Sequence, residues 1–387
     1  MDQQLDRMLA LLVEEIDRVE SSRQQFGNVI RKIKDSLDLG RFPAITENTL
    51  ETSFITKIEP THLSGLKIAG IDGGLSRRSF RSIDILLTRG IAVIFSFGPD
   101  EGPAAEFYPD PFPSPRVTPV LYALQGNELD QIASLERTAT ELRVILSVLD
   151  EFHTDLILLD GSLLNHPRDR PPTASIGYEK FQETIALYKQ LYRKARKSRT
   201  ILVGIIKDSR STRIVSILGE ILPHVLRNPS FFEMMQDVDY RWLLRFSRDT
   251  DLLNTFLDEG ERTFAFKYSS EVSHETSSLP EDLRDWAASI WVTYLKTARH
   301  DYPLRIEVFG NTDIDEPADR LNKALSAILP LSWQHTEYGL PSPIVEADTR
   351  ARIGNNETQL IMNRLMALTG VRYSPVEKRR MRNPFGG

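Results

Sequence analysis

Two short phrases constrain this chain more than any other feature: IAGIDGG at residues 68–74 and LILLDGS at residues 156–162. In each phrase, a run of apolar residues leads to one carboxylate followed by small residues. Asp is depleted in strands and glycine tends to end them, so each phrase predicts a strand that stops at an Asp-Gly turn. The recurrence indicates two strands that carry Asp72 and Asp160 at their carboxyl ends.

Around these phrases, the apolar periodicity predicts strand, strand, strand, helix, strand, helix, strand over residues 66–208. Residues 80–90 and 91–98 are expected to be two strands with a hairpin at Arg89-Gly90, and residues 127–152 keep a helical period. Strands joined by short turns are antiparallel, whereas strands joined through helices are parallel. The predicted fold is therefore α/β: a ribonuclease H-like mixed β-sheet core of three antiparallel strands, then parallel strands, with flanking helices.

The remainder of the chain is expected to form α+β additions to this core. We predict strands at 262–269 and 304–310, helices near 281–298, 315–328 and 356–369, and a proline-rich passage before the last helix. The expected organisation is an N-terminal helical segment, a main domain containing the core, and a C-terminal helix with a basic tail. Their ranges are 1–50, 51–355 with the core at about 66–210, and 356–387.

The composition restricts the class of protein. An apolar content of 41% supports a sizeable core, and a net charge of −6 argues against a generally basic coat for nucleic acid. The absence of cysteine excludes disulfides, thiolate metal sites and cysteine nucleophiles, and favours a cytoplasmic location. No run approaches the roughly 18 to 20 apolar residues of a membrane span. The N-terminus lacks signal-peptide features and predicts an amphipathic helix over 3–36, with an apolar stripe at Leu5, Leu9, Leu12, Ile16 and Val19.

In a sheet of the predicted order, the first and fourth strands lie side by side, so Asp72 and Asp160 are expected to be close together. Two uncompensated carboxylates repel each other, and a divalent cation is the ordinary remedy. The helix over 127–152 should cross this sheet and supply a third acid. We favour Glu141, which abuts apolar Leu142, over Glu136, which is expected to be solvated at the edge of the apolar stripe. Oxygen ligands without cysteine or clustered histidine suit Mn²⁺ or Mg²⁺.

Ions of this kind activate a water and stabilise the leaving oxygen in phosphodiester hydrolysis. Lys207, at the end of the strand phrase ILVGIIKDS, should reach the same sheet edge and steady the charge on a phosphate. Its alternative role is that of a surface lysine closing a strand. Basic residues near these phrases are candidates for DNA contacts, with Phe80 as a stacking surface, although outward-facing arginines on a strand would give the same pattern. They are Arg77, Arg78, Arg81, Arg210 and Arg213.

Five motifs in order resemble those of the NurA nucleases and together span about 66 to 353: IAGIDGG, LERTATELRVIL, DLILLDGSLL, ILVGIIKDS and GLPSPIVEADTRARI. The resemblance implies a ribonuclease H-like core and Mn²⁺-dependent single-strand endonuclease and 5′-to-3′ exonuclease activities in DNA end resection. It also implies a homodimer and a HerA-type hexameric translocase as partner. Carried over by motif, the site would comprise Asp72, Glu141 (or Glu136), Asp160 and Lys207.

The last motif departs from the family pattern. Leu340 and Ser342 stand where tyrosines are usual, and Asp348 stands where a histidine is usual. Asp is an acceptable metal ligand, so Asp348 is a candidate fourth acid. It is equally a candidate salt-bridge partner for Arg350 or Arg352.

Two other classes of protein remain open from the sequence. An actin- or sugar-kinase-like ATPase uses Asp-Gly turns on a related sheet, but such proteins duplicate the fold, and this chain contains one three-strand unit. A non-catalytic scaffold that binds DNA or a motor protein is the other alternative, although a scaffold has no need for repelling carboxylates. Metal-dependent cleavage of DNA would separate the three classes.

Overall fold

The computed structural model describes residues 3–80, 83–99, 102–121, 124, 126–164, 170–271, 281–310 and 313–369. Within these ranges, one mixed sheet has the order β1-β8-β10-β11-β7-β6-β2-β3-β4, with β5 also paired to β3 and β9 to β10. The strands are β1 Ile55–Lys57, β2 Lys67–Ser79, β3 Asp84–Ser96, β4 Ala104–Tyr108, β5 Arg116–Val120, β6 Leu156–Asp160, β7 Ile201–Ile206, β8 Glu261–Thr263, β9 Phe266–Lys267, β10 Ile290–Leu295 and β11 Leu304–Phe309.

The ribonuclease H-like core is confirmed. Strands β2, β3 and β4 form an antiparallel meander, β6 pairs in parallel with β2, and β7 pairs in parallel with β6. Because Ile71 of β2 is in register with Leu159 of β6, the next residues, Asp72 and Asp160, come side by side as predicted. Antiparallel β11 then extends the sheet beyond β7, which adds the outer strands to the core.

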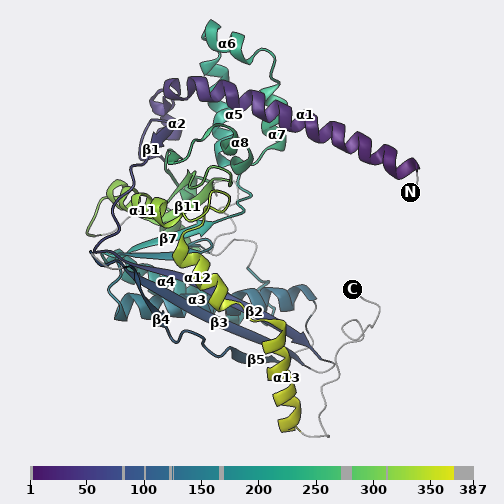
Figure 1. The fold of residues 1–387 in the computed structure, drawn as a ribbon, viewed down its shortest axis with the longest axis vertical. Helices are drawn as coiled ribbons and strands as arrows, with labels where there is room; N and C mark the ends of the chain where they lie inside the picture. The colour runs from purple at the N-terminus through teal and green to yellow at the C-terminus, as the bar shows by residue number, and fades with distance from the viewer. Residues whose placement is uncertain are drawn as a thin grey trace.

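Helices cover both faces of the sheet (Figure 1). Helix α3 packs on β2, β3 and α4, whereas α12 packs on β2, β3 and β6, and α11 packs on β7, β10 and β11. The helices are α1 Gln3–Ile33, α2 Pro43–Thr46, α3 Gly126–Glu151, α4 Gly177–Arg196, α5 Arg213–Val225, α6 Pro229–Met235, α7 Tyr240–Phe246, α8 Asp249–Phe256, α9 Tyr268–Glu271, α10 Glu281–Ala287, α11 Pro317–Leu331, α12 Ser342–Ala351 and α13 Asn355–Thr369.

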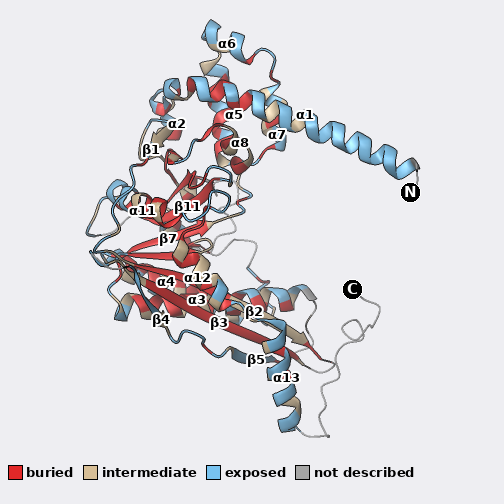
Figure 2. Cartoon of the chain, viewed as in Figure 1, coloured by how far each residue is buried: buried red, intermediate tan, exposed pale blue. Residues whose placement is uncertain are grey.

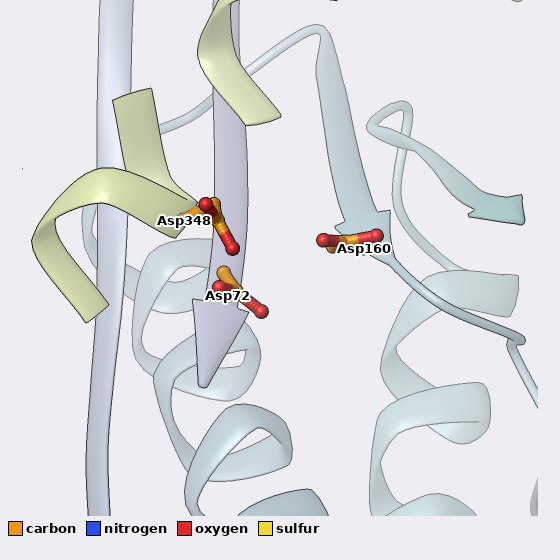
Figure 3. A group of neighbouring side chains, drawn as sticks. All are labelled: Asp72, Asp160 and Asp348. Carbon is orange, nitrogen blue, oxygen red and sulfur yellow. The ribbon is translucent and has the colours of Figure 1, made fainter. Parts of the chain in front are cut away.

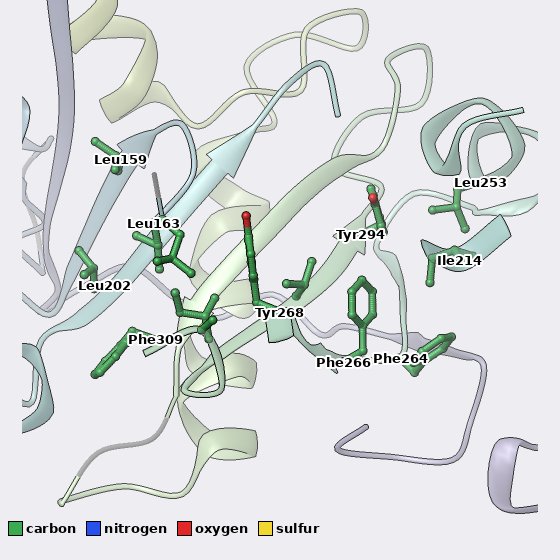
Figure 4. Packing of buried hydrophobic residues seen from close by; sticks show 14 of the residues in the cluster. Leu159, Leu163, Leu202, Ile214, Leu253, Phe264, Phe266, Tyr268, Tyr294 and Phe309 are labelled. Carbon is green, nitrogen blue, oxygen red and sulfur yellow. The ribbon is translucent and has the colours of Figure 1, made fainter. Parts of the chain in front are cut away.

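A large apolar cluster connects the sheet to helices α5 and α8. Figure 4 shows it running from Leu159 and Leu202 on the parallel strands, past Phe309, to Ile214 and Leu253 on α5 and α8. Burial of apolar area is the main stabilising contribution to folding. The parallel strands therefore lie in the interior of the protein and provide a firm base for the residues at their carboxyl ends.

Two predicted elements are wrong. The hairpin at Arg89-Gly90 does not exist, because β3 runs unbroken through both residues and stays paired with β2 along its length. The helix expected near 281–298 ends at Ala287, and residues 290–295 form β10, whose side chains are all buried. Aromatic and β-branched residues there, such as Trp291 and Val292, suit a buried strand.

The proline-rich passage contains an additional helix. Residues 342–351 form α12, preceded by Pro341 and with Pro343 in its first turn. Proline is tolerated there because the first backbone N–H groups of a helix have no partner within the helix. This helix places Asp348 on the sheet.

The N-terminal helix is confirmed, but only the carboxyl-terminal part of its apolar stripe packs against the rest of the protein. Helix α1 buries Phe26, Ile30 and Ile33 near its carboxyl end, whereas residues from Leu5 to Ile16 project into solvent (Figure 2). The side chains of Leu5, Leu9, Leu12 and Ile16 are between 46% and 55% exposed. None of the helices in the described ranges is both long and apolar enough to cross a bilayer.

Candidate active site

The aspartate of the first phrase lies within a strand and not at its end, which corrects the sequence prediction. Strand β2 continues beyond Asp72 to Ser79, and Asp72 is paired with Ile91 of β3. The glycines of this phrase serve close packing. A Cβ atom at Gly70 would lie 2.1 Å from the backbone oxygen of Pro343, and one at Gly74 would lie 1.8 Å from that of Ala351. Helix α12 can therefore lie directly on β2.

This close approach brings a third aspartate to the first two. Asp72 on β2, Asp160 at the end of β6 and Asp348 on α12 each offer a carboxylate oxygen, and these oxygens lie within 4.8 Å of one another (Figure 3). The three side chains line a cavity of about 310 Å³. Asp72 is 7% exposed, and the other two are partly exposed. The chain therefore gathers three acids from distant segments at one opening.

Burial and mutual repulsion make the charged form of this site costly. Burial raises the pKa of Asp72, and the neighbouring charges of Asp160 and Asp348 raise it further, against a hydrogen bond from the Gly73 backbone that lowers it. A cation that enters the cavity would stabilise the ionised form of Asp72. The acids are therefore arranged to hold a positive charge.

Glu141 of α3 lies on the opposite face of β2, directly beneath the site. A Cβ atom at Gly73 would lie 2.4 Å from its Oε1, so that glycine leaves room for the carboxylate. Burial raises the pKa of Glu141 to about 8, with the charges of Asp72 and Asp160 adding to the shift and that of Arg137 opposing it. Arg137 Nε approaches Oε1 to 3.3 Å, yet this oxygen has no hydrogen-bond partner.

Glu136, the alternative helix acid, is directed elsewhere. It is 4% exposed and pairs with Lys180 of α4, with Nζ 2.6 Å from Oε1. The expectation of a solvated residue is wrong, because α4 covers this part of α3. Glu136 thus has its own cation, whereas Glu141 lies against the strand that carries Asp72.

Lys207 reaches the site as the first residue after β7. Its Nζ lies 2.8 Å from Asp160 Oδ2, and its side chain is 32% exposed. Burial disfavours its charged form, but the hydrogen bond to Asp160 and the charges of Asp160, Tyr338 and Asp348 together raise the pKa of Lys207. The lysine is therefore a charged group in contact with one of the three acids.

Both sequence-based interpretations of Asp348 have a counterpart in the structure. Its carboxylate belongs to the acidic group, and Oδ2 also lies 3.2 Å from Arg352 Nη2 on the exposed side. Arg350 pairs with Glu346 instead and stacks over Phe107, 4.1 Å from the ring centre. An exposed pair of this kind contributes roughly 0 to 1 kcal/mol, so it leaves Asp348 able to bind another cation.

The predicted DNA-binding residues occupy different environments. Arg77 is paired with Asp130, Arg78 is half-buried, Arg210 is exposed, and Arg213 begins α5. Arg81 lies outside the described residues. The stacking surface proposed at Phe80 is wrong, since this side chain is 4% exposed and packs with the apolar residues Ile85, Leu87 and Met362.

Sequence reasoning missed Arg137 at the cavity and considered Arg352 only as a salt-bridge partner of Asp348. Arg137 and Arg352 both line the cavity, and each lies four residues from an acid of the site on the same helix or at its end. The spacing of four residues places side chains on one helix face, so it was a usable signal for both. Arginines suit phosphate because their donors are planar and paired.

A ribonuclease H-like sheet with carboxylates from two neighbouring parallel strands and a covering helix defines a class of protein, the metal-dependent nucleases of this fold. Comparison with known families agrees with that class. The NurA domain model matches residues 66–353, and the chain belongs to the NurA family of metal-dependent nucleases.

The crystal structure of the NurA nuclease from Sulfolobus solfataricus is similar over 97% of this chain and 100% of that one, at 15% identity and a TM-score of 0.56. Another NurA crystal structure gives 11% identity and a TM-score of 0.47 over 96% and 98% of the two chains. A NurA bound to dAMP and manganese gives 14% and 0.42 over 96% and 98%. Comparison with curated proteins finds no match.

Proposed function

We propose that this chain is a Mn²⁺-dependent deoxyribonuclease that cuts single-stranded DNA internally and degrades DNA from 5′ to 3′ during end resection. The observation that carries the proposal is the group formed by Asp72, Asp160 and Asp348, whose oxygens lie within 4.8 Å of one another at an open cavity. The activities named here follow from the family resemblance. The acids supply the chemical reason for a metal.

The donor set fits a hard divalent cation. Asp72, Asp160 and Asp348 would hold it, with Glu141 beneath Asp72, and the chain contains no cysteine that would favour a softer metal. Bound there, Mn²⁺ or Mg²⁺ supplies the Lewis-acid chemistry that activates a water towards a phosphodiester. Glu141 has a raised pKa and an oxygen, Oε1, without a hydrogen bond, so a cation close by would stabilise its charged form.

The other residues of the site would bind and orient the DNA. Lys207 contacts Asp160 and is placed to offset negative charge on the phosphate that reacts. Arg137 and Arg352 line the cavity and would hold adjacent phosphates. Arg77, Arg78, Arg210 and Arg213 would extend this contact along the strand, and Arg81 remains a prediction from the sequence.

The experiment is cleavage of end-labelled single-stranded DNA with Mn²⁺, Mg²⁺ or EDTA. We expect metal-dependent cutting that is abolished in Asp72→Asn and in Asp160→Asn, each of which keeps the size of the side chain but removes a ligand charge. Asp150→Asn is the matched control, because Asp150 is an exposed carboxylate on α3 that pairs with Lys194. Undiminished cutting by both site variants would disprove the assignment.

The proposal includes a homodimer and a HerA-type hexameric translocase as partners, as the family resemblance implies. The projecting half of α1 supports a protein partner, since Leu5, Leu9, Leu12 and Ile16 expose apolar area that a neighbouring chain would cover. Light scattering of the full chain, alone and mixed with a HerA-type translocase, tests both associations. A monomer that does not shift in the mixture would rule them out.

A further inference from the structure

The turn that follows Asp160 is held by a carboxylate from a strand that does not adjoin β6. Glu307 of β11 is 1% exposed. Its Oε2 accepts hydrogen bonds from the hydroxyl of Ser162 at 2.8 Å and from the backbone N–H of Leu163 at 2.9 Å. Because β7 lies between β6 and β11, this contact crosses a whole strand of the sheet.

A glycine makes that crossing possible. Gly204 of β7 is in register with Leu159 on one side and with Glu307 on the other. A Cβ atom at Gly204 would lie 2.6 Å from the backbone oxygen of Gly161 and 3.1 Å from the Leu163 nitrogen. Since no side chain stands there, the turn folds over β7 and meets Glu307.

The charge of Glu307 is balanced without solvent. Arg305, which is 5% exposed, donates to Oε1 from Nε at 3.0 Å, and its Nη2 lies 2.9 Å from the same oxygen. The guanidinium also lies 5.4 Å from the centre of the Tyr268 ring. A buried ion pair of this kind costs desolvation and is often replaceable by apolar residues with little loss of stability. A contribution to stability alone is therefore a poor explanation for the buried pair of Arg305 and Glu307.

Asp160 needs support that its own strand does not give. It is the last residue of β6, paired with Ile205, and the next residue, Gly161, has a φ angle of 140°, so the strand ends there, whereas β2 continues beyond Asp72. The Gly161 N–H donates to the Ile205 oxygen at 3.0 Å, and Tyr192 donates to the Leu163 oxygen. The Ser162 hydroxyl and the Leu163 N–H both donate to Glu307, and the same hydroxyl accepts from the Leu164 N–H at 3.2 Å.

We propose that Glu307 is a positioning residue that fixes Asp160 for metal binding by holding the Gly161–Leu163 turn across Gly204. The inference rests on the proposed function, because it takes Asp160 to be a metal ligand. Glu307 acts through the turn and touches neither substrate nor metal. Strand β11 thereby becomes part of the active site.

The test measures Mn²⁺ affinity by calorimetry in the full chain, together with thermal unfolding and DNA cleavage. We expect Glu307→Gln to weaken Mn²⁺ binding about 10- to 100-fold, the usual range for residues that orient a ligand. Ser162→Ala removes the hydrogen bond to Glu307 and the one that the hydroxyl accepts from the Leu164 N–H at 3.2 Å, and it should weaken binding several-fold while folding normally. It keeps the test decisive if Glu307→Gln unfolds.

Thr200→Val is the matched control. The Thr200 hydroxyl donates to the Thr154 oxygen at 2.6 Å, at the opposite end of the same two strands. We expect a comparable loss of stability in this variant with no change in Mn²⁺ affinity. If Ser162→Ala binds Mn²⁺ as tightly as the wild type, Glu307 has only a structural role and the inference is overturned.

The outcomes also separate this inference from the proposed function. A wild-type protein that binds Mn²⁺ but does not cut DNA would refute the nuclease, while weaker binding in the two variants would still support the role of Glu307. A wild type that cuts DNA, with variants that bind Mn²⁺ normally, would refute the role of Glu307 alone. A wild type that binds no Mn²⁺ would refute both.

Discussion

Strands β2 and β6 carry the same kind of phrase, apolar residues followed by Asp-Gly, yet the backbone after the aspartate differs between them. In β2 the strand continues beyond Asp72 to Ser79, paired with β3 along its length and with β6 from Ile68 to Ile71. In β6 the strand ends at Asp160, and the chain turns at Gly161. The comparison teaches that Asp-Gly does not by itself specify a turn. The neighbouring elements decide whether the glycine provides a bend or a space.

The two aspartates also differ in how their charges are met. Asp72 is buried, and its pKa is raised by burial and by neighbouring acids, with Glu141 close beneath it. Asp160 is in contact with Lys207. On the β2 side, Arg137 approaches Glu141 to 3.3 Å but burial outweighs its charge and keeps the pKa of Glu141 raised, whereas on the β6 side Lys207 is hydrogen-bonded to Asp160. Three predictions test this contrast, in order of decreasing effect.

The first concerns the buried acid beneath β2. An acid whose pKa rises from 4.5 to about 8 on folding contributes stability that is complete below pH 4.5 and is lost as the pH rises through 8. At about 1.4 kcal/mol for each pH unit, the loss is on the order of 4 kcal/mol. Without metal, Glu141→Gln should therefore be more stable than the wild type at pH 8.5 by about this amount, and similar to it near pH 4.5.

Urea unfolding of both proteins in EDTA at the two pH values measures this difference. Glu136→Gln is the control, because Glu136 lies on the same helix and is buried but is paired with Lys180. Equal differences from the wild type at both pH values would show that folding does not raise the pKa of Glu141.

The second prediction concerns the space on β2. Gly74→Ala places a methyl group 1.8 Å from the Ala351 backbone oxygen, so α12 must move away from the strand. We expect a loss of about 3 kcal/mol in the free energy of unfolding, the upper end of the range for overpacking. Gly98→Ala, where nothing lies within 4 Å of the added carbon, should change stability by no more than about 0.5 kcal/mol. Circular dichroism during urea unfolding compares them, and equal stabilities would mean that α12 does not rest on β2.

The third prediction concerns the cation at β6. Lys207→Met should lower kcat for DNA cleavage about 100-fold, the loss typical of one charge-stabilising group, equivalent to about 2.7 kcal/mol. Its side chain is 32% exposed, so stability should change by less than about 1 kcal/mol. Lys194→Met is the matched control. The Lys194 side chain is 34% exposed and also pairs with an aspartate, but it lies near the carboxyl end of α4 and does not contact the acids of the site. Equal rates for the two variants would exclude a role for Lys207 in the reaction.

The sequence was most informative where a feature depends on strand order. The closeness of Asp72 and Asp160 follows from parallel strands joined by right-handed crossovers. The position of Lys207 at the same edge of the sheet follows from the next parallel strand. Periodicity was less informative for α3, since Glu136 and Glu141 both border its apolar face. The difference between them lies in Lys180 of α4 and Gly73 of β2, which no local pattern reveals.

The last helix of the site was not predictable from local signals. The prolines at 341 and 343 argue against a helix in a sequence-based prediction, so α12 was not expected. The alternating polar residues of this helix do not indicate which strand it covers. Only its contact with Gly70 and Gly74 brings Asp348 to the other acids. Likewise, Glu307 in a fully buried strand gives no sign in the sequence that it reaches across Gly204 to the turn after Asp160.

The sequence by itself therefore determined the ribonuclease H-like class of the core, the family and the closeness of Asp72 to Asp160, because these depend on the order of strands and helices and on motifs along the chain. The tertiary structure alone decided that the first Asp-Gly phrase stays extended, that Asp348 joins the acids and that Glu141 lacks a hydrogen-bond partner at Oε1. The physical reason is range: local preferences act over a few residues, whereas close packing and charge depend on groups that are distant in sequence and adjacent in space.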